Sequence, residues 1–344
     1  MKALTCLITF CHLMLYGDCF AQPANDNVGV IDLQLTDSSR SNWLGTGPRP
    51  IRSIAWYPAT PSGKKEVVTD MEQFASPVVL FRDAEISKHK SKYPLIIISH
   101  GSQGNATKMQ WLGYYLASKG FIAMAISHNG NDAEELRKEG LTLSDFCMWE
   151  RPKDLSIVID KMRYDKFFSK KIDTARIAAA GFSLGGTTVI WAAGAIFDMD
   201  RLAEKEGPIP DRYKNDVNRF SAFVRENAIG INSVKHRGDS FKDRRLKAVF
   251  ALAPAIGQGF DESGLKNITI PVQIVTGSQD RINPMAQNAE HFVRYIPSAK
   301  PLIVLPGERG HYTRPAVGRE RPDGLKEVAE LAVTFFKHVL NVTD

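Results

Sequence analysis

Short apolar segments alternate with helical patterns from residue 51 to the end of the chain, and this alternation limits the fold more than any other feature. The predicted strands are mostly near-continuous runs of Ile, Val, Leu and Ala, and they cover residues 51–59, 94–101, 121–128, 176–183, 246–254, 272–277 and 301–307. Strands that are buried on both faces have such runs. Helices are predicted over residues 106–119, 153–168 and 325–340. The pattern predicts an α/β fold with a mostly parallel central sheet flanked by helices.

The domain organisation follows from the absence of repeats and linkers between these segments. No internal repeat, low-complexity tract or linker rich in Gly, Ser or Pro divides the chain, so we expect a single domain over residues 22–344. Residues 197–245 break the alternation because they are strongly charged and only thinly apolar. They predict a helical insertion outside the sheet, either a lid over a site or a solvated surface segment. A second, shorter excursion covers residues 129–149.

The N-terminus has the pattern of a secretory signal peptide, which we place at residues 1–21. Its apolar run, residues 3–16, is shorter than the ~20 residues of a membrane-spanning helix and contains His12, so no stable membrane span is expected. Cleavage after Ala21 would leave Cys147 as the single cysteine and exclude an internal disulfide. The sequence therefore predicts export to the periplasm or the extracellular space. A buried N-terminal hydrophobic helix is the alternative.

The charge distribution excludes some partners. The net charge of +6 arises from 44 basic and 38 acidic residues spread along the chain, without a basic block, so nucleic-acid binding is not expected. The sequence has no His-Glu-x-x-His, no paired-cysteine spacing and no phosphate-binding glycine-rich motif. We therefore expect no metal and no cofactor. The oligomeric state is left open.

One serine lies between glycines at the end of a predicted strand. The segment Gly-Phe-Ser-Leu-Gly, residues 181–185, matches G-x-S-x-G, with an apolar strand before it and a helical pattern after it. A turn this sharp needs almost no side chain two positions to either side of the serine, and it lifts the hydroxyl above the sheet. The pattern predicts Ser183 as a nucleophile rather than as a turn serine.

A serine nucleophile needs a base and a carboxylate that orients the base. In sheets of this kind the chain order is serine, then acid, then histidine. Asp280 follows the predicted strand 272–277 directly, and His311 follows the last predicted strand. Both positions lie at the carboxyl ends of strands, where such sheets gather their functional groups. We therefore predict catalytic roles for Ser183, Asp280 and His311.

Other residues compete for these roles. His100 and His128 also end predicted strands, but they precede the serine and would break the expected order. Asp261 follows the strand 246–254 and is the alternative acid; Asp280 is favoured because it follows its strand more closely.

Acyl transfer also needs two backbone N–H groups that stabilise the oxyanion. One should belong to the residue after the nucleophile, which is Leu184. The other should come from the turn after an early central strand, and the glycine-rich segment His-Gly-Ser-Gln-Gly supplies Ser102. A tight connection without a catalytic role is the alternative interpretation of this segment.

Several longer segments resemble a known family. The motifs RSIAWYPA, YPLIIISHGSQGN, WERPKDLSIVID, RIAAAGFSLGG, VTGSQDRINP and LPGERGHY, within residues 50–315, are similar to secreted α/β-hydrolases of the dienelactone-hydrolase-like and platelet-activating-factor-acetylhydrolase-like group. The resemblance implies an α/β-hydrolase fold, a triad of Ser183, Asp280 and His311, no cofactor, and ester hydrolysis through an acyl-enzyme. Dienelactone hydrolases use a cysteine nucleophile, so Ser183 favours a serine esterase. The acetylhydrolases take their acid after an earlier strand, where this chain has Pro254, and this favours Asp280.

Together these features predict a hydrolase of carboxylic esters, whose substrate is a small-molecule, lipid or polymer ester. An amidase or peptidase would use the same groups. A binding module with a hydrolase fold and no chemistry is the alternative from another class of protein.

Overall fold

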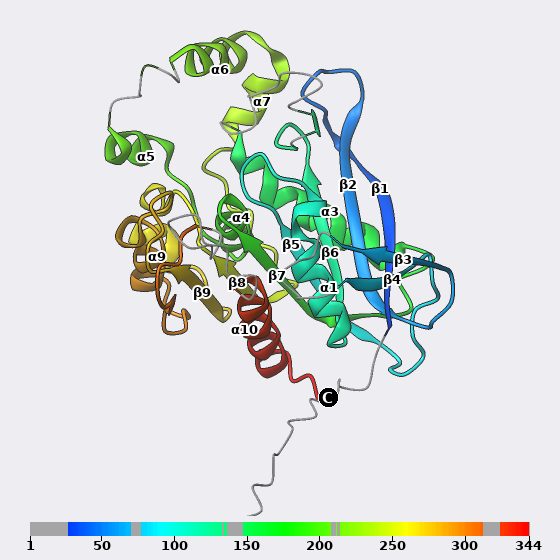
Figure 1. Ribbon diagram of the computed structural model, residues 1–344. Coiled ribbons are helices and arrows are strands. Elements are labelled where there is room, and N and C mark those ends of the chain that lie inside the picture. Colours follow the sequence, from blue (N-terminus) through cyan, green and yellow to red (C-terminus); the bar gives the residue numbers. More distant parts are fainter. Residues whose placement is uncertain are drawn as a thin grey trace, which may run out of the picture.

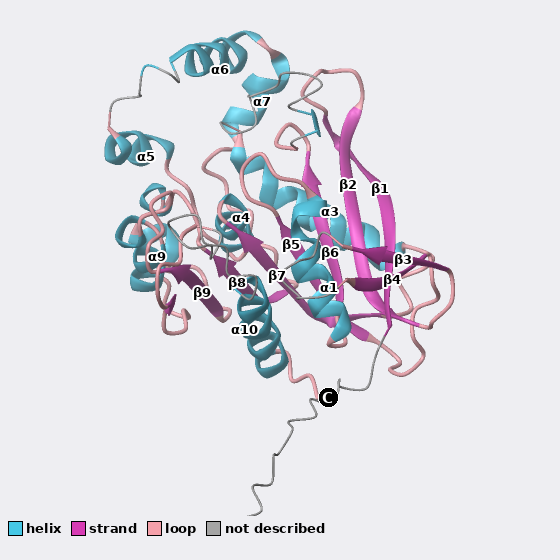
Figure 2. Ribbon diagram, in the orientation of Figure 1, coloured by secondary structure: helices cyan, strands magenta, loops and turns pink. Residues whose placement is uncertain are grey.

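The computed structural model describes residues 27–69, 77–132, 134–135, 147–207, 211, 214–311 and 324–343. The predicted signal peptide, residues 1–21, lies outside the described residues, as does most of the excursion predicted over 129–149. The described residues form one twisted sheet with helices on both of its faces (Figures 1 and 2).

The sheet has ten strands in the order β10-β9-β8-β7-β5-β6-β2-β1-β4-β3. Its strands are β1 (Asn27–Ser41), β2 (Pro48–Ala59), β3 (Lys64–Val68), β4 (Val78–Arg82), β5 (Tyr93–Ser99), β6 (Ile122–His128), β7 (Ile172–Phe182), β8 (Leu246–Leu252), β9 (Val272–Gly277) and β10 (Ile303–Leu305). The strands from β10 to β6 in this order pair in parallel, whereas β2 pairs antiparallel with β6 and β1. The predicted α/β class and mostly parallel sheet are confirmed. The carboxyl ends of the parallel strands all lie at the same end of the sheet, and the candidate active site lies there.

The helices alternate with the parallel strands. The α-helices are α1 (Gln110–Ser118), α3 (Arg151–Tyr164), α4 (Leu184–Ala192), α5 (Met199–Glu206), α6 (Lys214–Glu226), α7 (Ala228–Lys235), α8 (Glu262–Leu265), α9 (Ala289–Tyr295) and α10 (Gly324–Val339). Short 3-10 turns are η2 (Ala106–Met109), η4 (Met148–Glu150), η6 (Gly257–Gly259) and η7 (Met285–Gln287). The helix predicted over 153–168 starts two residues earlier, because Pro152 suits a first helical turn, and stops at Tyr164. Asp165 ends it by accepting the N–H groups of Phe167 and Phe168.

Two apolar cores lie on opposite faces of the sheet. In β5, Leu95 and Ile97 pack on the side of α3 and α4, and Ile96 and Ile98 pack on the side of α1 and α10. All four side chains are fully buried. Successive strand residues point to opposite faces, so a strand covered on both faces has no polar position. This explains why the central strands are uninterrupted apolar runs.

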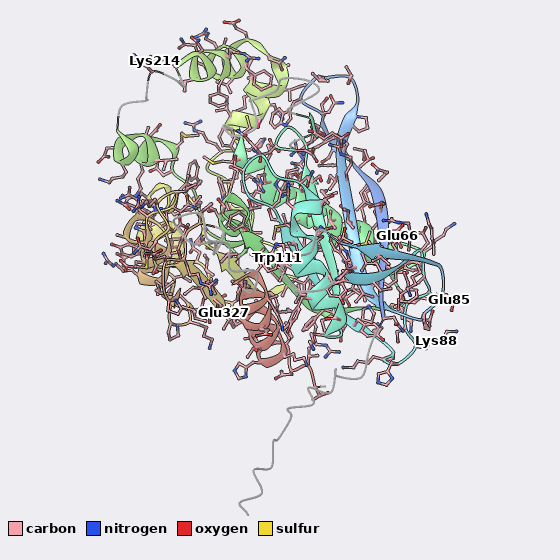
Figure 3. The ribbon with its side chains drawn as sticks, in the orientation of Figure 1. Glu66, Glu85, Lys88, Trp111, Lys214 and Glu327 are labelled. Atoms are coloured by element: carbon pink, nitrogen blue, oxygen red, sulfur yellow. The ribbon has the colours of Figure 1, made fainter. Side chains whose placement is uncertain are left out.

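The far end of the sheet was not predicted. β1 and β3 are partly exposed, and their polar positions hide them from a search for apolar runs. β4 is a short, largely apolar strand, Val-Val-Leu-Phe-Arg, and it was missed although its pattern is readable. β3 is the edge strand, and its Lys64 and Lys65 are exposed while Glu66 accepts a hydrogen bond from Arg82 at 2.8 Å. Glu66 lies with Glu85 and Lys88 on the outer side of this end (Figure 3). Charged edge strands discourage pairing with other chains.

The insertion predicted over 197–245 contains the helices α5, α6 and α7, which lie outside the sheet layers at one end of the molecule (Figure 1), and its residues 236–245 return to β8 without a helix. It leaves the core only after Phe197, which is buried against Trp191 and Phe260. α6 and α7 rest on two tryptophans of the body. Trp43 makes an edge contact with Phe223, with 5.9 Å between ring centroids. Trp149 Nε1 donates to the Ser233 carbonyl at 3.0 Å.

Cys147 is a free, buried cysteine, and burial raises the pKa of its thiol to about 12. In the part of the chain that the structure describes, every helix is too short or too polar to cross a bilayer.

Candidate active site

Ser183 lies between β7 and α4 in a backbone conformation that few non-glycine residues adopt, with φ 54° and ψ −123°. Its N–H donates to the Leu252 carbonyl at 2.8 Å, and its own carbonyl accepts the Thr187 N–H at 3.1 Å. A Cβ at Gly181 would come within 2.1 Å of the Gly185 carbonyl oxygen. The flanking glycines are therefore a steric requirement of this turn, and the turn leaves Ser183 8% exposed at the end of the sheet.

The structure brings the three predicted side chains together. His311 Nε2 lies 3.0 Å from Ser183 Oγ, and His311 Nδ1 lies 2.9 Å from Asp280 Oδ2. The Asp280 side chain is fully buried and that of His311 is 9% exposed. The His311 ring also packs on Phe182, with 4.9 Å between ring centroids. Serine, histidine and aspartate thus form a continuous hydrogen-bonded chain.

Hydrogen bonds to the backbone fix the positions of Asp280 and His311 relative to each other. Asp280 Oδ1 accepts the N–H groups of Ile282 and Asn283 at 3.0 and 2.9 Å, which leaves Oδ2 for His311. The Gln279 N–H donates to the Arg309 carbonyl at 2.7 Å, so the turn after β9 is tied to the segment that carries His311.

The competing residues lie elsewhere. Asp261 caps α8, where its side chain accepts the Gly264 N–H at 2.7 Å. His100 and His128 are fully buried behind the site. The structure thus pairs His311 with Asp280 among the candidates named from the sequence.

Both predicted oxyanion donors border Ser183. Leu184 is the first residue of α4, where backbone N–H groups have no partner within the helix. Ser102 follows Gly101 in the turn after β5, and a Cβ at Gly101 would lie 3.3 Å from Ser183 Cβ. The two backbone segments therefore meet at the serine.

The serine follows β7, the aspartate follows β9 and the histidine follows β10, all on the parallel part of the sheet. A solved structure of a ferulic acid esterase from Streptomyces cinnamoneus superposes with a TM-score of 0.61 at 17% identity, covering 92% of this chain and 91% of that chain. The chain has the α/β-hydrolase fold. The α/β-hydrolase fold expected from the sequence is confirmed.

Two sequence comparisons agree with this fold. A family model described as PET hydrolase-like matches residues 46–200 of this chain. The cutinase est1 of Thermobifida alba is 25% identical over 214 residues, which is 62% of this chain. The match spans about half, 51%, of that cutinase. The predicted resemblance to an esterase group of α/β-hydrolases is confirmed.

A buried polar network next to the site was not predicted from the sequence. Ser99 Oγ lies 2.9 Å from His128 Nε2, and His128 Nδ1 lies 2.8 Å from Asp154 Oδ2. Arg49 donates to Asp154 at 2.8 and 2.9 Å, and Arg40 donates to it at 2.5 Å. The sequence signal for this network was a pair of opposite charges, with Arg151 just before the helix predicted over 153–168 and Asp154 within it. The three-residue spacing of Arg151 and Asp154 puts both on the face that buries Leu155 and Val158.

The charges in this network fix the protonation of its members. Burial opposes ionisation of Asp154, but Arg49 and Arg40 outweigh it and hold the pKa of this carboxyl well below its usual range. Burial and the nearby Arg151 lower the pKa of His128 to about 3, against the opposing effect of Asp154. His128 is therefore a neutral imidazole that donates to Asp154 and accepts from Ser99.

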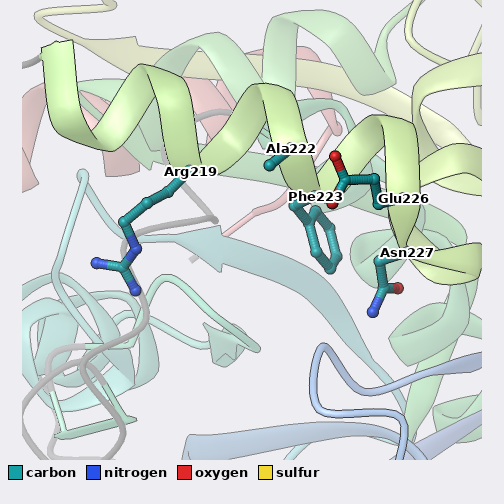
Figure 4. Close-up of a pocket in the computed structure, with 5 residues that line it drawn as sticks. All are labelled: Arg219, Ala222, Phe223, Glu226 and Asn227. Carbon is teal, nitrogen blue, oxygen red and sulfur yellow. The ribbon is translucent and has the colours of Figure 1, made fainter.

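A hollow of about 470 Å³ lies beside α6 and is lined by Arg219, Ala222, Phe223, Glu226 and Asn227. Phe223 on α6 and Asn227, which caps α7, point toward the loop between β1 and β2 (Figure 4). None of the predicted catalytic residues lines it. In the described residues, no group of three or more His, Cys, Asp or Glu side chains is arranged to hold a metal ion.

Proposed function

We propose that this α/β-hydrolase cleaves carboxylic esters through an acyl-enzyme formed on Ser183. The observation that carries the proposal is the hydrogen-bonded chain from Ser183 Oγ through His311 to Asp280, with distances of 3.0 and 2.9 Å. A serine hydroxyl is a weak nucleophile at neutral pH and needs a base within hydrogen-bond reach. Ser183 meets this condition on a turn that holds it at the surface of the sheet.

The proposed reaction follows from the order of these groups. As Ser183 Oγ bonds to the ester carbonyl carbon, its proton passes to His311 Nε2 and the carbonyl electrons move onto oxygen. The backbone N–H groups of Leu184 and Ser102 are proposed to stabilise that oxyanion. The bond to the leaving alkoxide then breaks, and His311 returns the proton to it. Water repeats the sequence on the acyl-enzyme, and Asp280 holds the imidazolium that forms in each half.

The names of similar proteins favour esters over amides. Their names or descriptions are PET hydrolase-like, cutinase and ferulic acid esterase. We therefore propose an ester substrate, either a small molecule or a lipid or polymer ester. An amidase is the second candidate, because amide cleavage uses the same groups.

A test compares wild type with Ser183→Ala on short p-nitrophenyl esters and on matched p-nitroanilides. We expect ester turnover by wild type, little anilide turnover, and a loss of roughly 10⁶-fold in kcat for Ser183→Ala. A fluorophosphonate probe should label wild type and not the variant. Ester turnover that survives in Ser183→Ala would refute the proposed nucleophile. A folded wild type that neither turns over esters nor reacts with the probe would favour the binding-module alternative.

We also propose that the protein is exported by cleavage after Ala21, as the sequence pattern of residues 1–21 predicts. Expression of the full chain in a bacterium and mass spectrometry of the periplasmic or secreted product should give Gln22 as the first residue. An intact N-terminus on a cytoplasmic product would contradict this proposal.

A further inference from the structure

The turn that carries Ser102 is held from behind by buried side chains. Arg151 is 2% exposed, and its Nη2 donates to Ser99 Oγ at 3.1 Å and to the His100 carbonyl. Its Nη1 donates to Asn131 Oδ1 at 3.4 Å. One guanidinium therefore joins the end of β5 to the loop after β6.

Asn131 completes this attachment on the other side of Ser102. It is 1% exposed, and its Oδ1 accepts the Gln103 N–H at 2.9 Å. Gln103 has a positive φ of 54°, which is unfavourable for a residue with a side chain. This hydrogen bond therefore helps to fix a backbone conformation that Gln103 would not adopt readily.

His100 binds a further polar group of the turn, the Gly101 carbonyl. Its Nε2 accepts the His128 N–H at 3.2 Å, so its Nδ1 carries the proton and donates to the Gly101 carbonyl at 2.6 Å. The carbonyls before Ser102 and the N–H after it are thus each bound by a side chain that solvent does not reach.

The same turn presses against the nucleophile's helix. A Cβ at Gly185 would come within 2.6 Å of the His100 carbonyl oxygen, the same oxygen that accepts from Arg151. A shift of this carbonyl would change the distance between the Ser102 N–H and Ser183. Oxyanion donors act through their fixed position, and misplacement by about 1 Å can cost 10²-fold in rate.

We propose that Arg151 and Asn131 are positioning residues for the oxyanion hole, holding the 99–104 turn so that the Ser102 N–H faces the developing oxyanion. This inference rests on the proposed esterase function. The buried Ser99–His128–Asp154 chain performs no reaction and supports Arg151 through Ser99.

The test is Asn131→Ala, with Asn129→Ala as the matched control. Asn129 is a buried asparagine two positions away whose side chain donates to Glu135 and makes no hydrogen bond to the turn. For Asn131→Ala we expect kcat on p-nitrophenyl acetate to fall roughly tenfold or more with little change in KM. Asn131→Asp keeps both acceptor contacts and should restore kcat to within a few-fold of wild type.

A second readout separates positioning from general destabilisation. Boronic acids form a tetrahedral adduct on the serine, so their affinity for Asn131→Ala should fall by the same factor as kcat/KM. Asn129→Ala should keep wild-type affinity even if its melting temperature falls equally. If Asn131→Ala does not fold, Ser99→Ala, which removes one acceptor of Arg151 at constant volume, is tested with the same readouts.

The positioning role would be overturned if Asn131→Ala and Asn129→Ala had equal kcat and equal boronate affinity. The proposed function would stand in that case, provided that the wild type is active and Ser183→Ala is not. A wild type without ester turnover or boronate binding would overturn both.

Discussion

Gly185 lies against Ser99 so closely that a Cβ on the glycine would come within 2.0 Å of the Ser99 carbonyl oxygen. The first residues of α4 and the end of β5 are therefore in backbone contact. This contact sets how near the nucleophile comes to the turn that follows β5, and it depends on a position without a side chain.

Gly185→Ala should destabilise the protein by about 3 kcal/mol or more, because the added methyl group meets backbone atoms that cannot turn away. Gly47→Ala is the matched control, since nothing lies within 4 Å of a Cβ at that position. Urea unfolding followed by circular dichroism measures both. Equal midpoints for the two variants would show that the turn has room for a methyl group.

Asp280→Asn should lower kcat on a p-nitrophenyl ester by roughly 10⁴-fold with little effect on folding. The amide keeps the shape of the carboxylate but cannot stabilise the imidazolium of His311. Asp261→Asn, at the other aspartate that the sequence offered as the acid, should retain kcat within a few-fold. A large loss in Asp261→Asn with an active Asp280→Asn would reverse the assignment.

Ser102→Pro should lower kcat by roughly 10²- to 10³-fold, because proline removes the proposed oxyanion donor. Ser102→Ala keeps the backbone N–H and should retain activity, since the Ser102 side chain is exposed. Steady-state kinetics on the same ester compares the two. Comparable activity in both variants would assign the second donor to another residue.

The buried histidines predict a dependence of stability on pH. Burial and Arg151 lower the pKa of His128 to about 3 and that of His100 well below 6.5. Between pH ~6.5 and ~3 the unfolded rings bind protons that the folded ones exclude, so the free energy of unfolding decreases as pH falls through this window. Within this window each ring changes the free energy of unfolding by about 1.4 kcal/mol per pH unit. Above pH ~6.5 both rings are neutral in the folded and unfolded states, so they cause no further change. Urea unfolding across this range measures the slope, and a constant free energy from pH ~7 to ~5 would contradict the neutral assignment.

The sequence was sufficient for the parallel half of the fold. β5, β6 and β9 are covered on both faces, so their apolar runs are unbroken and their ends can be located to within about two residues of those observed. β7 starts at Ile172, four residues before the predicted 176, because the residues that follow Ile172 are mostly polar and at least partly exposed. β1 could not be located in this way, because one side of much of its length is exposed and its sequence is correspondingly mixed.

The candidate site also has a part that could be predicted from the sequence and a part that could not. Ser183, Asp280 and His311 could be predicted as site residues because Ser183 directly follows β7, and Asp280 and His311 lie three and six residues beyond the ends of β9 and β10. The network around Arg151 and Asn131 could not be predicted, because a buried arginine and an exposed one look alike in a sequence. Only the packing of α3 against the ends of β5 and β6 shows that the Arg151 guanidinium donates to side chains and a carbonyl rather than to water.

The buried Ser99–His128–Asp154 chain shows that two hydrogen-bond distances do not define an active site. Its separations of 2.9 and 2.8 Å match those of Ser183–His311–Asp280, and a geometric template would accept either. Ser99 ends a strand deep in the molecule with no exposed surface, while Ser183 is lifted on a strained turn into reach of solvent. Only one of the two serines can meet an incoming electrophile, and what selects it is the path of the main chain around it.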